Sequence, residues 1–170
     1  KALGIAGITA LSFLPLKNYG QNNYIKKESE KGYTALSKGM ELSVCEQLAM
    51  VYFDSSAHVL NGKYSTKDLI KKVNLSLDYL DKSAGALNLF VEKFRDYSPY
   101  ENKDLNLAMS VETNLDTNQV KKFFPYFEKI REEEEYFLKN PEKMNLQIWL
   151  DDLIKEYEET HSVIEFSLKQ

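Results

Sequence analysis

The side chains best suited to chemistry are two histidines and the carboxylates spaced about one helical turn from them. Glu158 and His161 form a Glu-x-x-His pair, whose spacing puts both side chains on one face of a helix. Di-metal helical bundles combine two such pairs with two further glutamates. This chain has one pair, with Glu46, Asp54 and His58 as the remaining weak candidates. The ligand set is incomplete, so the sequence predicts no metal site and no cofactor, and histidines at a helix surface are the simpler interpretation.

Nucleophilic catalysis and nucleotide binding find no support in the sequence. Cys45, the single cysteine, and His58 lie on one expected helix, where their spacing separates them by about 20 Å. The chain has no Gly-x-Ser-x-Gly motif, no phosphate-binding glycine loop and no His-Glu-x-x-His motif. The sequence therefore leaves enzymatic activity undecided and favours a non-catalytic protein.

The charge distribution argues against a nucleic-acid partner. The 170-residue chain carries 22 basic and 26 acidic residues, for a net charge of -4. Its lysines occur in scattered pairs with acidic residues nearby, so no basic stripe is available to bind a phosphate backbone. The acidic run at 132–135 lies within an expected helix, where we interpret it as a solvated face.

An aromatic cluster around Pro125 is the most unusual local feature. Helical spacing puts Phe123, Tyr126 and Phe127 on one side and turns Phe124 away from them. These rings either close one end of a bundle, which is the simpler interpretation, or form a surface that binds a partner. The residues predicted for such a partner-binding surface are Phe123, Phe124, Tyr126, Phe127, Tyr97 and Tyr100.

The elements that must position these residues are helices, and the clearest one covers residues 65–97. Its apolar residues recur at spacings of three and four, as in a helix that buries one stripe. Ser65 or Thr66 can cap its first turn, and Pro99 lies just beyond its end. The predicted stripe consists of Ile70, Val73, Leu77, Leu80, Ala84, Leu87, Val91 and Phe94.

A second helix is expected over residues 33–60, ending at Asn61-Gly62. The short connection to the next helix makes the two helices antiparallel neighbours, an αα-hairpin. The predicted stripe of this helix consists of Leu36, Met40, Val44, Leu48, Val51 and Val59. Its central turns are apolar on much of the circumference, as in a deeply buried helix, because of Cys45, Ala49, Tyr52, Phe53 and Ala57.

The start of the chain divides into an apolar segment at 1–16 and a polar linker at 17–32, ahead of a helical domain at 33–170. Residues 2–14 are similar to the hydrophobic region of a signal peptide and are short for a membrane span. They also suit a membrane anchor or a helix that plugs a groove of its own domain. We expect an extracytoplasmic, periplasmic or membrane-associated location, with a cytoplasmic one as the alternative.

The second half of the chain predicts two more helices. Residues 116–119 have the form of a capping box, so a helix should begin there, restart at Pro125 and end near Asn140. Another helix should begin around Pro141. Alternating apolar residues at 105–112 and 163–168 also permit a two-stranded antiparallel ribbon.

Together these patterns predict an all-α or mainly α fold, a four- to five-helix bundle around the central hairpin, with the ribbon as an optional addition. The expected function is non-catalytic binding or assembly, as a helical complex subunit that contacts a protein partner or forms a homo-oligomer, with membrane contact through residues 2–14. The alternatives are a metal-dependent bundle enzyme that uses Glu158 and His161, and a carrier of a small apolar ligand.

Overall fold

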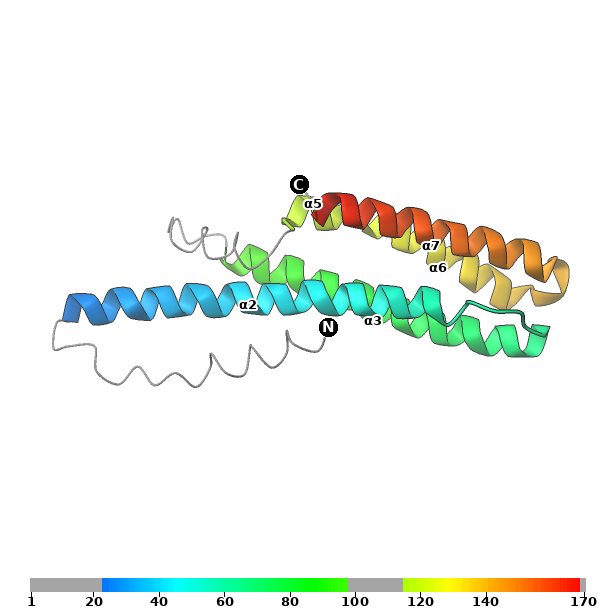
Figure 1. The fold of residues 1–170 in the computed structure, drawn as a ribbon, viewed down its shortest axis with the longest axis horizontal. Helices are drawn as coiled ribbons and strands as arrows, with labels where there is room; N and C mark the ends of the chain where they lie inside the picture. Colours follow the sequence, from blue (N-terminus) through cyan, green and yellow to red (C-terminus); the bar gives the residue numbers. More distant parts are fainter. Residues whose placement is uncertain (1–22, 98–114, 169–170) are drawn as a thin grey trace.

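A computed structural model shows the protein as two antiparallel helical hairpins packed against each other (Figure 1). It describes the backbone of residues 23–97 and 115–168, and the side chains of residues 40–95 and 115–168. The described ranges contain no strand, which confirms the mainly α bundle. The elements are α2 (Asn23–His58), α3 (Thr66–Tyr97), α5 (Thr117–Lys121), α6 (Phe124–Lys139), the 3₁₀ turn η1 (Pro141–Lys143) and α7 (Leu146–Leu168).

Helices α2 and α3 form the predicted central hairpin, and α2 extends past the ends of α6 and α7 (Figure 1). The turn between them contains Gly62, whose φ of 148° lies in a region that L side chains rarely adopt. A Cβ at this position would also lie 2.8 Å from the hydroxyl of Tyr64. Ser65 caps α3, because its Oγ accepts a hydrogen bond of 3.2 Å from the Asp68 amide.

The buried seam of α3 differs from the predicted stripe at every second position. Val73, Leu80 and Leu87 are buried as predicted, whereas Leu77 and Ala84 are only half-buried. The positions between these core residues belong to Ser76 and Ser83, which lie outside the predicted apolar stripe. Small hydroxyl side chains fit where helices approach closely, so they can replace leucine in the seam. The seam consists of Leu69, Val73, Ser76, Leu80, Ser83, Leu87 and Phe90.

The predicted face of α2 is wrong. Leu48 and Val51, two members of the predicted stripe, are exposed, and Leu36 lies outside the described side chains. The buried face points the other way and combines large apolar residues with the small residues Cys45, Ala49 and Ser56, which let α3 approach closely. Leucine and valine on the opposite face gave the stronger apolar pattern. The buried face consists of Leu42, Cys45, Ala49, Phe53, Ser56 and Leu60.

Two further boundaries require correction. Helix α2 begins at Asn23, so residues 23–32 are helical rather than a polar linker. Residues 163–168, the second strand of the optional ribbon, belong to α7. The first strand at 105–112 lies outside the described residues. Because β-pairing needs both segments, helix at 163–168 removes the ribbon.

The second hairpin begins at the predicted capping box. Asp116 accepts hydrogen bonds from the amides of Asn118 and Gln119, and the Gln119 side chain accepts from the Asp116 amide. The helix breaks after one turn and restarts with Pro125 in the first turn of α6. Helix α7 starts at Leu146, later than expected, because residues after Pro141 form a 3₁₀ turn.

The apolar segment 2–14 lies outside the described residues, and its anchoring, signal or plugging role stays a prediction. In the part of the chain that the structure describes, no helix has both the length and the apolar character needed to cross a membrane.

Candidate functional site

Four of the five candidate metal ligands line one groove between α2 and α7. Asp54 and His58 from α2 face Glu158 and His161 from α7 across a space of about 420 Å³. Its apolar wall includes Phe53 and Ile154, from the same two helices. Glu46, the fifth candidate, is buried on α2 about 12 Å before Asp54 along the helix axis. Four of the five candidates named from the sequence therefore lie in the same groove.

The groove geometry suits a histidine held between two carboxylates better than a metal ion. His161 has Asp54 Oδ1 3.2 Å from its Nδ1 and Glu165 Oε1 3.3 Å from its Nε2. Both ring nitrogens thus face carboxylates, which leaves neither directed at an open coordination position. Among the described residues, no group of three or more His, Cys, Asp or Glu side chains is arranged to hold a metal ion.

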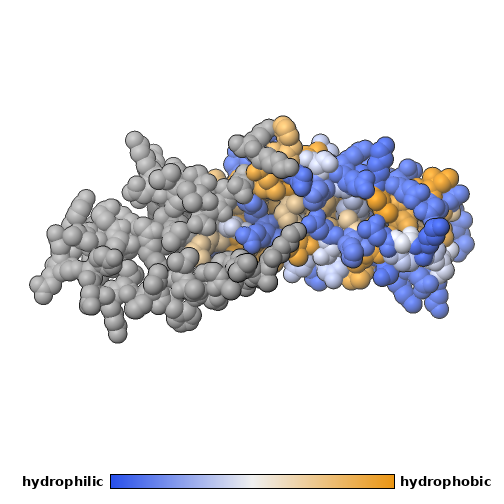
Figure 2. Space-filling view, in the orientation of Figure 1, coloured by the Kyte–Doolittle hydropathy of each residue, from blue (hydrophilic) through white to orange (hydrophobic). Residues whose placement is uncertain are grey.

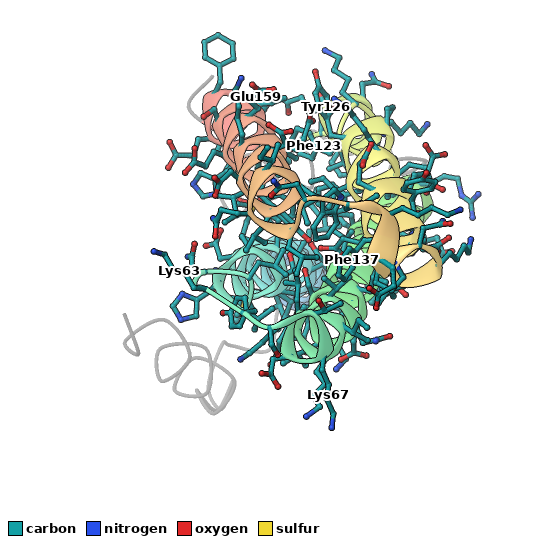
Figure 3. The ribbon with its side chains drawn as sticks, turned by 90° about the vertical axis from the view of Figure 1, so that its right-hand side faces the viewer. Lys63, Lys67, Phe123, Tyr126, Phe137 and Glu159 are labelled. Carbon is teal, nitrogen blue, oxygen red and sulfur yellow. The ribbon has the colours of Figure 1, made fainter. Side chains whose placement is uncertain are left out.

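The aromatic candidates divide between core and surface. Phe123 and Phe127 are 1% and 4% exposed, so these rings have almost no surface to offer a partner. Figure 3 shows Phe123 and Phe137 pointing between the helices, whereas Lys67 points away from them. Phe124 is half-buried against the core and Tyr126 is 40% exposed, so Tyr126 rather than Phe124 is the outward ring. The side chains of Tyr97 and Tyr100 lie outside the described residues.

A buried polar network lies where all four long helices meet. Glu134 of α6 is completely buried, and its Oε1 accepts hydrogen bonds from Ser76 of α3 at 2.7 Å and Tyr157 of α7 at 2.9 Å. The Ser76 hydroxyl also lies 3.0 Å from the Tyr157 hydroxyl and 3.0 Å from the carbonyl oxygen of Ser56 on α2. Oε2 of Glu134 has no hydrogen-bond partner among the described residues.

Burial dominates the acid–base properties of this network. Loss of hydration raises the pKa of the Glu134 carboxyl from 4.5 to about 7, although the hydrogen bonds from Ser76 and Tyr157 oppose the shift. The negative charge of Asp81 raises it further. Burial likewise raises the pKa of the Tyr157 hydroxyl, so this tyrosine stays protonated and acts as a donor.

Sequence reasoning missed Glu134 because it lies in an acidic run that was interpreted as a solvated face. Its three neighbours in the run are exposed or half-buried, as expected. The signal that distinguishes Glu134 is its place in the heptad pattern of α6, where it occupies a core position between Ile130 and Phe137. A charge on an otherwise apolar seam is the pattern to search for.

The largest group of aligned, exposed apolar side chains lies on the side of the α2–α3 hairpin that faces away from α6 and α7. Leu48 and Val51 of α2 are 43% and 59% exposed, and Leu75 and Leu89 of α3 are 40% and 44% exposed. Tyr52 and Tyr79 stack at the seam between the two helices, with ring centroids 6.3 Å apart. We define the hairpin outer face by these residues: Leu48, Val51, Tyr52, Leu75, Tyr79 and Leu89.

The other large exposed apolar side chains are more isolated. Tyr126 and Tyr136 are about 15 Å apart along α6, and Ile148 and Phe166 are about 27 Å apart along α7. On the face drawn in Figure 2, described apolar side chains form small patches separated by hydrophilic ones. The hairpin outer face is therefore distinguished by exposed apolar side chains from two neighbouring helices, with the charged pair of Asp78 and Lys82 between Leu75 and Leu89 on α3.

Comparison of the chain with models of protein families, with curated proteins and with solved structures finds no match.

Proposed function

We propose that the protein is a non-catalytic binding and assembly protein, a helical subunit that docks an amphipathic helix of a protein partner on the hairpin outer face. The observation that carries this proposal is the alignment of Leu48 and Val51 on α2 with Leu75 and Leu89 on α3. All four are apolar, at least 40% exposed and placed on the side of the hairpin away from its core. Exposed apolar side chains grouped on one face can serve as an interaction site.

The dimensions of the face favour a helix as its occupant. Leu75 and Leu89 are about 21 Å apart along α3. The axes of α2 and α3 are about 10 Å apart, and the side chains widen the face further. The resulting area of roughly 300 Å² is well below the roughly 800 Å² per partner of a standard protein interface, and it fits one helix of about four turns. A globular partner or a second copy would need additional contacts.

Charged side chains lie among and beside the apolar residues and would set the direction of the bound helix. Lys82 of α3 pairs with Asp78 at 2.6 Å and also lies over the Tyr79 ring, 5.6 Å from its centroid. Lys93 of α3 pairs with Glu41 of α2 at 2.8 Å. A partner helix with an apolar stripe and charged flanks complements this arrangement.

The proposal is tested by the size of the native complex that contains the tagged full-length chain in its source cells. We expect the wild-type chain to migrate well above its 19.7 kDa monomer mass and the double variant Leu48→Lys/Val51→Lys to shift to the monomer mass. Ile148→Lys, at an isolated exposed site on α7, is the matched control and should leave the complex intact. A wild-type chain found only as a monomer, or a complex unaffected by the double variant, contradicts the proposal.

The α2–α7 groove supports a metal-dependent enzyme less well. Metal analysis of the purified full-length protein tests that alternative, because stoichiometric iron, manganese or zinc would favour it over the binding role.

A further inference from the structure

We propose that Glu134 is a proton-binding site at the junction of the four long helices, and that loss of its proton destabilises the packing of the two hairpins against each other. The site has a contact from each helix: the Ser56 carbonyl oxygen on α2, the Ser76 hydroxyl on α3, the Glu134 carboxyl on α6 and the Tyr157 hydroxyl on α7.

The count of hydrogen atoms favours the protonated carboxyl. Ser76 and Tyr157 carry one hydroxyl hydrogen each. If Glu134 is ionised and both hydroxyls donate to Oε1, the charged Oε2 is left buried without a donor among the described residues. A proton on Oε1 can be donated to the Ser76 hydroxyl at 2.7 Å, and Ser76 then donates to the Ser56 carbonyl oxygen at 3.0 Å. Tyr157 donates to the remaining lone pair of Oε1 at 2.9 Å, and the unpartnered Oε2 is then a neutral carbonyl oxygen.

The charges around the site act in the same direction. Asp81 on α3 is the described charge that acts most clearly on Glu134, and its negative sign favours the neutral acid. Arg131 of α6 is engaged by Asp81 in an ion pair, which directs this nearby cation to the bundle surface. From α2 and α7 the site is faced by the neutral Ser56 and Tyr157. The oxygen atoms lie within hydrogen-bond distance of one another, as a shared proton requires, and no group of acidic, histidine or cysteine side chains among the described residues is arranged to hold a metal ion.

The direction in which stability changes with pH follows from the linkage between proton binding and folding. A carboxyl whose pKa is higher in the folded than in the unfolded chain binds more protons when folded, so its contribution is fully present below pH 4.5. That contribution is lost as the pH rises to about 7, and stability stays lower above that pH. A shift from 4.5 to about 7 corresponds to a fall of about 300-fold in the folding equilibrium constant.

The test combines urea unfolding of the full chain between pH 4 and pH 9 with three variants. We expect wild type to lose stability with rising pH, Glu134→Gln to lack this fall and to be more stable than wild type at pH 9, and Glu133→Gln, an exposed neighbour, to behave as wild type. The double variant His58→Gln/His161→Gln should retain the fall. A fall that persists in Glu134→Gln, or disappears in the histidine variant, overturns the proposal.

A direct titration keeps the proposal testable even if Glu134→Gln does not fold. Carbon-13 NMR of the side-chain carboxyls should show one glutamate in the full chain that titrates near pH 7. Because the Ser76 hydrogen bond favours the ionised form, Ser76→Ala should move this midpoint to higher pH. A Glu134 midpoint at or below 4.5, or a midpoint that Ser76→Ala leaves unchanged, overturns the proposal.

Discussion

The hydroxyl of Ser83 on α3 donates a hydrogen bond of 2.6 Å to the carbonyl oxygen of Ala49 on α2. Seven residues earlier on α3, Ser76 makes the equivalent contact to Ser56, seven residues later on α2. Two helical turns therefore separate matching hydroxyl-to-carbonyl contacts along the antiparallel seam. Their equal spacing fixes the register of the hairpin more sharply than apolar side chains alone would, because a hydrogen bond requires a defined donor position.

Removing the Ser83 hydroxyl should weaken this register contact. We expect Ser83→Ala to lower the free energy of unfolding by about 1 kcal/mol, as is usual for a lost intramolecular hydrogen bond. Ser162→Ala is the control, because its exposed hydroxyl bonds only to the carbonyl of Glu158 in its own helix. Urea unfolding of both variants checks the prediction, and an equal loss in the two would show that the Ser83 contact has no special role.

A charge placed in the α3 seam should be far more damaging than one placed on its outer face. Leu80 is 1% exposed, so Leu80→Asp buries an unpaired carboxylate and should lower the free energy of unfolding by several kcal/mol, about 3 or more. Leu75→Asp, five residues away and 40% exposed, should cost less than about 1 kcal/mol. Thermal unfolding with similar losses in both variants would contradict the assignment of the two faces.

The capping box at the start of α5 should contribute measurably to stability. Asp116→Ala leaves the amides of Asn118 and Gln119 without their side-chain acceptor and should cost about 1 kcal/mol. Asp152→Ala, which removes an exposed carboxylate within α7, is the matched control and should be nearly neutral. If calorimetry finds no difference between these variants, the cap does not stabilise the second hairpin.

Burial of Cys45 should protect it from modification. The residue is 5% exposed, and loss of hydration raises the pKa of its thiol, so both access and thiolate formation are reduced. We expect alkylation of the native protein at pH 8 to be at least about 10-fold slower than alkylation in urea. Equal rates in the two conditions, followed by mass spectrometry, would show that this part of α2 is open.

The fold class and the central hairpin could be predicted because long helices carry a strong periodic signal. The faces were harder to predict, because the α2–α3 seam uses Ala49, Ser56, Ser76 and Ser83, whose small side chains carry little apolar signal. On α2 the leucines and valines of the outer face dominated the pattern and reversed the assignment. The helical start at Asn23 was missed because polar residues give no apolar stripe.

A candidate site could be predicted from the sequence where its residues lie close together on one helix. Glu158 and His161 share a face of α7 by sequence separation alone, and the hairpin topology brought Asp54 and His58 to the same groove. The Glu134 network could not be found in this way, because Ser76, Glu134 and Tyr157 come from three helices whose relative register the sequence does not specify. Tertiary packing, rather than a local motif, creates that site.

The most direct measurement of the binding role is site-specific photo-crosslinking in source cells, with a photoreactive residue at Val51 in one chain and at Ile148 in another. Both positions are about 60% exposed, so accessibility is matched, but only Val51 lies on the hairpin outer face. If the hairpin outer face binds a partner, position 51 gives a discrete product heavier than the monomer that disappears with Leu48→Lys, and position 148 gives no such product. No heavier product at position 51, or equal products at both positions, would contradict it.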